Sequence, residues 1–239
     1  MRVGDLSASR GFYERLGFEE AFALGQSDAA TEAFIKVNDR QFIELYSKRS
    51  PAEPAAFMHV CYESSDLDGL NRFYRSEGLA PTDVRRAGAG NLLFSLKGPG
   101  QQVIEYTQYM PGSRHTNDRG QHLGAHRVAE TILGFATEVE DQAAARAFYA
   151  EKLGFRPARS FAERQPALAL PGSSGEQVEF GQQATRTAFT LFFAVADLDQ
   201  ATRQLKSLGI AFTPHGRTAS IADPDGNRIV FVESPVSVR

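Results

Sequence analysis

Hydrophobic and polar residues alternate with two different periods along this chain, and the stretch 57–106 shows both most completely. The run FMHVCYE places His59 and Cys61 on the same face of a predicted strand. The run LDGLNRFYRSEGL that follows has apolar residues at helical spacing and contains Gly78 where a helix would end. Two strand-like runs come next, and the second contains Glu105. The pattern predicts a strand, a helix and then further strands.

The same order of elements occurs four times along the chain. Each copy has an aspartate, a helical segment and a closing glycine, and in the first three copies a Phe-Tyr pair begins seven residues after the aspartate. An aspartate satisfies the free amides at a helix start, and glycine allows the chain to leave the helix. The aspartates are Asp5, Asp66, Asp141 and Asp197, and the glycines are Gly17, Gly78, Gly154 and Gly209.

These repeats predict an α+β fold of four βαβββ units that associate in two pairs. The N-terminal pair spans 1–108, with units at 1–48 and 55–108, and the C-terminal pair spans 131–239, with units at 131–183 and 187–234. Residues 109–130 are polar and contain glycines, which is typical of a linker. We expect each pair to form a cup-shaped, antiparallel-type sheet with its helices on the outer face.

Composition narrows the classes of function that this chain can have. The net charge of −3 lacks the basic excess that nucleic-acid binding requires. Cys61 is the single cysteine, so no intrachain disulfide can form and a reducing compartment is expected. No apolar run has the length of a signal core or a membrane span. We therefore expect a cytoplasmic protein with neither nucleic acid nor membrane as partner.

The candidate chemistry is at the two ends of the second unit. His59 is on its first strand and Glu105 is on its last, and an imidazole near a carboxylate makes a metal site plausible. Cys61 shares the face of His59, and we expect a small buried residue there, although a soft ligand or a reactive thiol is an alternative.

The Phe-Tyr pair followed by LGF, and the closing run DPDGNRIVFVE, resemble the vicinal oxygen chelate superfamily. That superfamily contains glyoxalases, bleomycin- and fosfomycin-resistance proteins and extradiol dioxygenases. The resemblance implies a divalent metal, such as Zn, Ni, Mn or Fe, bound by the first and last strands of paired units. At the matching positions this chain has His59, Glu44 and Glu105, and Glu44 or Glu105 would serve as general base.

Several positions of this chain lack the metal ligand that the resemblance implies. The first-strand position of the first unit falls upstream of Met1, so either this ligand is lost or the chain begins inside its own first strand. In the C-terminal pair the corresponding positions hold Gly134, Thr190 and Val230, and only Glu179 is a carboxylate. A metal in that half is therefore not expected.

Three functions remain open on this evidence. A metal-dependent lyase or isomerase similar to glyoxalases is favoured, because two of the three candidate ligands are carboxylates. An extradiol dioxygenase requires a second histidine, supplied from upstream or from the linker residues His115, His122 and His126. A non-catalytic protein that binds a drug or another small molecule is the third possibility, and a homodimer is compatible with all three.

Overall fold

The computed structural model describes the chain except for residues 27–28, 100–101, 162–164, 174, 182–188 and 235–239. The N-terminal half contains α1 (Leu6–Arg15), β1 (Glu19–Gln26), β2 (Ala29–Lys36), β3 (Phe42–Tyr46), β4 (His59–Glu63), α2 (Leu67–Ser76), β5 (Arg85–Arg86), β6 (Leu92–Lys97) and β7 (Val103–Gln108). A short helix, α3 (Arg114–Asn117), lies in the linker. The C-terminal half contains β8 (Thr131–Glu138), α4 (Gln142–Ala147), a π-helical turn (Phe148–Lys152), β9 (Arg156–Ala158), β10 (Ala167–Ala169), β11 (Gln177–Gly181), β12 (Phe189–Val195), α5 (Leu198–Ser207), β13 (Thr213–His215), β14 (Thr218–Ala222) and β15 (Arg228–Glu233).

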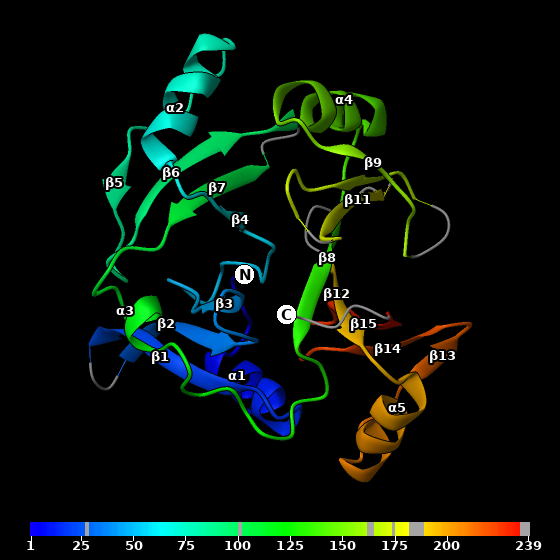
Figure 1. Ribbon diagram of the computed structural model, residues 1–239. Coiled ribbons are helices and arrows are strands. Elements are labelled where there is room, and N and C mark those ends of the chain that lie inside the picture. The colour runs from blue at the N-terminus through cyan, green and yellow to red at the C-terminus, as the bar shows by residue number, and fades with distance from the viewer. Residues whose placement is uncertain (27–28, 100–101, 162–164, 174, 182–188, 235–239) are drawn as a thin grey trace.

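These elements confirm the predicted α+β class, and the two halves differ in how their sheets join. In the N-terminal half, the described strands form two sheets with the orders β1-β2-β3 and β4-β7-β6-β5. In the C-terminal half they form one eight-stranded sheet, ordered β13-β14-β15-β12-β8-β11-β10-β9. The two N-terminal sheets face each other, with α1 and α2 on their outer sides (Figure 1). The further prediction that each pair closes into a cup stays a prediction.

The sheets are mixed, which corrects the expected antiparallel type. The first strand of a unit runs parallel to its last strand in the pairs β4–β7, β8–β11 and β12–β15. A helix follows each first strand and carries the chain across the sheet, and a crossover of this kind is what parallel pairing needs.

Arg2 lies between the two N-terminal sheets. It bridges Ala56 in antiparallel sense and Tyr46 in parallel sense. Strand β12 has the same two relations, antiparallel to β8 and parallel to β15. The backbone around Arg2 therefore occupies the position of a first strand in its unit.

The repeated residues have the local roles that their spacing predicts. The four aspartates are N-caps, and each side chain accepts a hydrogen bond from the backbone amide three residues later. The four closing glycines have φ between 66° and 85°, which side chains with a Cβ rarely adopt. The tyrosine of each aromatic pair is buried, and Leu205 takes that place in the fourth unit. The third unit has one extra residue before LGF, and its helix ends in the π-helical turn, which is how a single inserted residue is accommodated.

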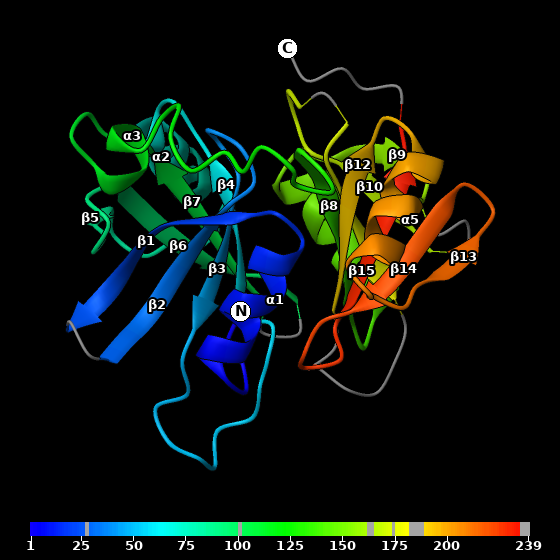
Figure 2. The same ribbon diagram turned by 90° about the horizontal axis from the view of Figure 1, so that it is seen from below.

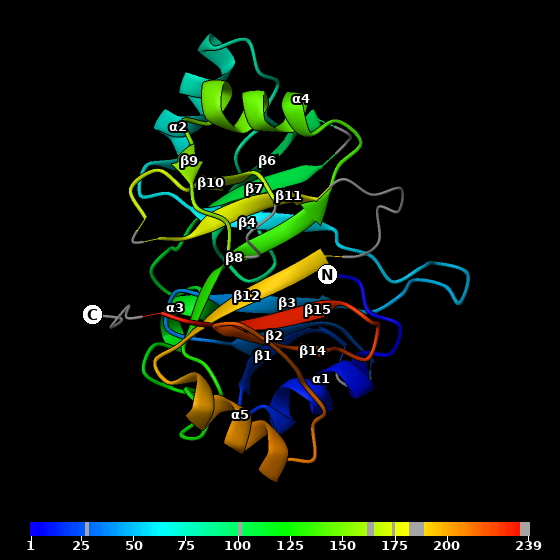
Figure 3. The same cartoon turned by 90° about the vertical axis from the view of Figure 1, so that its right-hand side faces the viewer.

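Two apolar cores join the N-terminal and C-terminal halves. One combines side chains of the first and fourth units, such as Phe18 and Phe193, whose rings stack at 5.4 Å. The other combines the second and third units, including Tyr74 and Tyr149. Figures 1 and 3 show this arrangement, with α1 and α5 at one end of the molecule and α2 and α4 at the other.

The structure does not test the two domain boundaries that the sequence predicts. The division into pairs at 109–130 stays a prediction, and the boundary expected between 183 and 187 lies outside the described residues. Among the described helices, none is long and apolar enough to cross a membrane.

Candidate functional site

Strand β3 presents Glu44 and Tyr46 on the face that looks toward the second sheet. Glu44 is paired in register with Phe34, and Tyr46 with Glu32 on β2, so these side chains share one face. The alternate residues Ile43 and Leu45 are buried in the core beneath α1. The period of two thus separates a structural face from a polar face.

The second sheet presents His59, Cys61 and Glu105 in the same way. Cys61 is in register with Glu105 on β7, and Glu105 is in register with Ser95 on β6. The intervening residue Ile104 packs in the core with α2. We call these two opposed faces, defined by Glu32, Glu44 and Tyr46 and by His59, Cys61 and Glu105, the N-terminal inner surface.

The three candidate ligands come together on this surface although they are far apart in the sequence. His59 Nε2 lies 3.0 Å from Glu44 Oε2 and 3.9 Å from Glu105 Oε2. The Tyr46 hydroxyl donates a hydrogen bond to Glu44 Oε2 at 2.8 Å, and the Ser95 hydroxyl donates one to Glu105 Oε1 at 3.1 Å. Each carboxylate is therefore oriented by a neighbouring hydroxyl.

The electrostatics of this surface distinguish its carboxylates. Burial by itself would raise the pKa of Glu44, but the hydrogen bond and charge of His59, with the Tyr46 hydroxyl, lower that pKa to about 2. Burial raises the pKa of Glu32, and the negative charge of Glu44 adds to the effect. With Glu105 included, three carboxylates lie near one imidazole. The buried Met1 ammonium, which donates a hydrogen bond to the Glu44 carbonyl, balances part of their negative charge, and a cation could balance the rest.

Cys61 corrects the expectation of a small buried residue. Its side chain is exposed on the N-terminal inner surface instead of packing in the core. The crowded surroundings, together with the charges of Glu44 and Glu105, raise the pKa of its thiol. A protonated thiol is a weak nucleophile and a weak metal ligand, so Cys61 adds little to the chemistry of the site.

The donor set can be tested against a divalent metal ion. Ligands bound to one ion at 2.0–2.2 Å lie roughly 3 to 4 Å from each other, and the two distances from His59 Nε2 fall in that range. One imidazole and two carboxylates suit Zn, Mn, Ni or ferrous iron. Among the described residues, however, no three His, Cys, Asp or Glu side chains form a complete metal site as they stand. The two donor pairs that include His59 have suitable distances, and metal binding stays a prediction.

His115 in the linker is held in an aromatic box and away from the predicted ligands. Its Nδ1 accepts a hydrogen bond from the Asn91 side chain at 2.8 Å, and burial lowers the pKa of His115 to about 4. The ring packs against four aromatic side chains, Phe22, Phe34, Phe42 and Tyr109. We assign the hydrogen on this imidazole to Nε2, because the amide of Asn91 donates to Nδ1.

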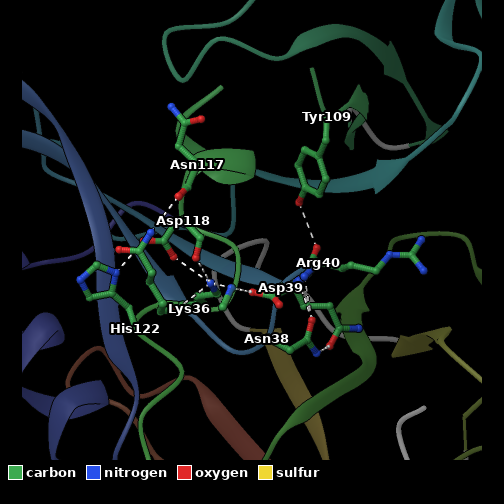
Figure 4. Close-up of polar contacts among 11 residues, drawn as sticks. Lys36, Asn38, Asp39, Arg40, Tyr109, Asn117, Asp118 and His122 are labelled. Carbon is green, nitrogen blue, oxygen red and sulfur yellow. Dashed lines mark hydrogen bonds and ion pairs between the residues drawn. The ribbon is translucent and has the colours of Figure 1, made fainter. Parts of the chain in front are cut away.

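The rest of the linker is fixed by a buried lysine at the end of β2. The Lys36 ammonium is wholly buried and donates to the carbonyl and carboxylate of Asp118, at 2.5 and 2.8 Å, and to the carbonyl of Gln121 at 2.7 Å. Asp39 pairs with the same ammonium at 2.8 Å. His122 contacts Asp118 instead of the site (Figure 4). Lys36 thus anchors residues 118–121 of the linker to β2, and we call this linker the strap.

Three of the corresponding positions of the C-terminal half, Gly134, Glu179 and Val230, have structural contacts. Gly134 has φ of 145°, and a Cβ there would approach the Gln177 carbonyl oxygen to 1.8 Å. Glu179 is wholly buried and accepts hydrogen bonds from the Ser160 hydroxyl and the Phe161 amide. Val230 lies in an apolar cluster with Phe192 and Ala194. Within the described part of this half, the ligand positions serve packing.

Sequence reasoning did not single out Tyr46, Ser95 or Glu32. Tyr46 is two residues after Glu44 on the same strand face, so the period of two was a signal for it. Ser95 and Glu32 reach the site only through cross-strand register, which has no local signal.

Comparison with known proteins agrees with this geometry at the level of the family. Residues 132–231 match the Glyoxalase/Bleomycin resistance protein/Dioxygenase superfamily. No curated protein matches the chain. The match lies in the C-terminal half of the chain and confirms the resemblance to this superfamily there.

Solved structures with the same fold include several 2,3-dioxygenases. The 2,3-dioxygenase LapB from Pseudomonas sp. KL28 superposes with a TM-score of 0.71 at 16% identity, covering 100% of this chain and 91% of that one. A catechol 2,3-dioxygenase gives 0.69 at 17% identity, covering 100% and 87%. A substrate complex of homoprotocatechuate 2,3-dioxygenase from Brevibacterium fuscum gives 0.68 at 17% identity, covering 98% and 78%. At these identities the similarity establishes the fold alone.

Proposed function

We propose that this chain is a metal-dependent enzyme that acts on a small substrate chelated through adjacent oxygens. His59, Glu44 and Glu105 would bind the divalent ion on the N-terminal inner surface. The observation that carries this proposal is the position of His59 Nε2, 3.0 Å from one carboxylate and 3.9 Å from the other. The excess of carboxylates around one imidazole gives a divalent cation a further electrostatic reason to bind.

Each side chain has a separate role in this proposal. When bound, the ion would polarise a carbonyl oxygen of the substrate. Glu44 stays ionised because its pKa is about 2, so it is a good ligand and a weak base. Glu105 is therefore the better candidate for general base, and the Ser95 hydroxyl orients it. Tyr46 keeps Glu44 aimed at His59.

Lyase or isomerase chemistry is favoured over oxygen chemistry by the donors present. A non-haem iron oxygenase needs two histidines and one carboxylate around ferrous iron. Of the linker histidines, His115 is engaged by Asn91 and the aromatic box, and His122 contacts Asp118. Two carboxylates and one histidine remain, which suits proton abstraction beside a polarised carbonyl.

Turnover by reconstituted protein tests the proposal. The chain is loaded separately with Zn, Ni, Mn and ferrous iron and assayed for isomerisation of 2-oxoaldehyde hemithioacetals and for oxygen uptake with catechols. We expect isomerisation without oxygen uptake, and we expect Glu105→Gln to lower kcat by about 100-fold or more. Exposed His122 supplies the control, because His122→Gln changes an imidazole outside the site and should leave kcat within twofold. Oxygen uptake that depends on ferrous iron would instead establish the dioxygenase.

A non-catalytic small-molecule binding protein is the second candidate. The absence of ligating side chains at Gly134, Thr190 and Val230 favours it, because half of the chain then contributes packing alone. Drug affinity separates the two ideas. If a compound that binds the chain keeps its affinity in the His59→Ala variant, binding without metal chemistry is the better account. The expected cytoplasmic location and homodimer stay predictions under either function.

A further inference from the structure

A cavity of about 730 Å³ opens beside the proposed metal site. Tyr46 and Met58, which line it, are next to the proposed ligands: Tyr46 donates to Glu44, and Met58 precedes His59 in the chain. The remaining wall comes largely from the connection between β3 and β4, residues 47–58, which projects from the body of the protein in Figures 2 and 3. A small molecule in this cavity would therefore contact Tyr46, whose hydroxyl reaches Glu44, and residues of this connection.

Three positively charged residues line the cavity: Arg2, and Lys48 and Arg49 of the connection. Arg2 is held by Glu53 at 3.3 Å and by the Pro54 carbonyl, so its charge is partly balanced. Lys48 and Arg49 also line the cavity, and among the described residues neither side chain has an ion-pair or hydrogen-bond partner. Two cations without partners at the wall of a cavity attract an anion.

The carboxylates in this region leave those two cations unbalanced. Glu53 pairs with Arg2 and also accepts a hydrogen bond from the backbone amide of Arg49. Glu32 is at the inner side, in register with Tyr46 on the sheet. Of the two carboxylates that line the cavity, Glu53 is thus engaged by Arg2 and the Arg49 amide, and Glu32 lies beside Tyr46, so neither pairs with the Lys48 or Arg49 side chain.

We propose that Lys48 and Arg49 bind the anionic end, a phosphate or a carboxylate, of the substrate whose oxygens reach His59 and Glu44. This inference rests on the proposed function and narrows its substrate class to small anionic molecules. Arg49 offers a planar fork that matches either anion, and Lys48 offers a point charge. The two side chains act as positioning residues, since they lie away from the reacting atoms.

An NMR titration of the metal-stripped, dialysed full chain tests this binding site. Inorganic phosphate and the dicarboxylate malonate are added in separate titrations, and backbone amide shifts give both the location and the Kd. We expect the largest shifts at residues 47–49. In the double variant Lys48→Met/Arg49→Met we expect a Kd about tenfold higher or more, since a hydrogen bond to a charged group contributes at least that factor. Tighter binding of phosphate indicates a phosphate ester as substrate, and tighter binding of malonate indicates a carboxylate.

The matched control is the double variant Arg85→Met/Arg86→Met. It removes two adjacent, exposed positive charges on β5 of the other sheet, and we expect it to bind both anions within twofold of the unaltered chain. A Kd that stays within twofold in Lys48→Met/Arg49→Met, or no shift at residues 47–49 with either anion, would overturn the inference. Because no metal is present, failure of the metal site leaves this titration unaffected, and the two proposals fail separately.

Discussion

The two halves of the chain use the same strand positions for different purposes. In the N-terminal half, the last-strand residues Glu44 and Glu105 point toward His59 on a partly exposed surface. In the C-terminal half, Glu179 at the equivalent position is wholly buried and accepts hydrogen bonds from the loop at 160–161. Val230 takes the other last-strand position, in an apolar cluster.

This difference shows that a carboxylate at a family ligand position is not sufficient evidence for a metal site. What distinguishes Glu105 from Glu179 is the set of donors around each. Glu105 has one hydroxyl and an imidazole nearby, whereas the Glu179 oxygens are satisfied by a hydroxyl, an amide N–H and the Gln177 side chain. These three hydrogen bonds engage most of the roughly four acceptor positions of the Glu179 carboxylate, which leaves it little capacity for an ion.

The largest expected effect comes from adding a single methyl group to the C-terminal half. Gly134→Ala places a Cβ against the Gln177 carbonyl at a positive φ, so we expect the free energy of unfolding to fall by about 4 kcal/mol. Chemical denaturation measures this change. Gly11→Ala in α1 is the control, because its Cβ meets nothing within 4 Å and a helical alanine should stabilise slightly. Equal stability of the two variants would show that position 134 can accommodate a side chain, and hence a ligand.

The strap that crosses the N-terminal half should give that half its own pH dependence. The pKa of His115 is about 4 in the folded chain against 6.5 for an ordinary histidine, so the unfolded state takes up the proton first as the pH falls. His115 therefore costs no stability above pH 6.5, and its contribution falls by about 3 kcal/mol between pH 6.5 and pH 4.

Denaturation of the unaltered chain and of His115→Phe, at several pH values across that window, isolates this contribution. Their difference in unfolding free energy should change with pH in favour of the variant as the solution becomes acidic. A difference that is constant with pH would contradict the buried, neutral imidazole.

A smaller effect distinguishes the two carboxylates directly. Glu179→Gln replaces a buried acceptor of several hydrogen bonds, and we expect a loss of about 2 kcal/mol in unfolding free energy. Glu105→Gln is its matched partner in the N-terminal half and should change stability by less than about 0.5 kcal/mol. Thermal and chemical denaturation of both variants makes the comparison. An equal loss of unfolding free energy in Glu179→Gln and Glu105→Gln would contradict the distinction between a structural and a functional carboxylate.

Local signals in the sequence predicted most of the repeated architecture. The N-caps, the left-handed glycines and the buried tyrosines depend on neighbours a few residues away, and the structure has all of them. The proximity of His59, Glu44 and Glu105 was expected from the family resemblance, which implies metal ligands on the first and last strands of paired units.

The features that sequence did not predict depend on contacts between distant segments. Lys36 is buried only because Asp118 and Gln121 of the strap close over it, and no pattern around Lys36 marks this. Cys61 is in an apolar run typical of a core, but its face is the one that the opposite sheet leaves open. The parallel strand pairs likewise follow from crossovers that a one-dimensional pattern does not specify.

Metal binding at equilibrium is the most direct test of the central claim. The metal-stripped chain, His59→Gln and Thr190→Val, which alters the matching first-strand position of the C-terminal half, are titrated with Zn and Mn by calorimetry. We expect one ion per chain, an affinity at least about 100-fold weaker in His59→Gln, and an unchanged affinity in Thr190→Val. Equal binding by the unaltered chain and His59→Gln, or no binding at millimolar metal, would contradict the account.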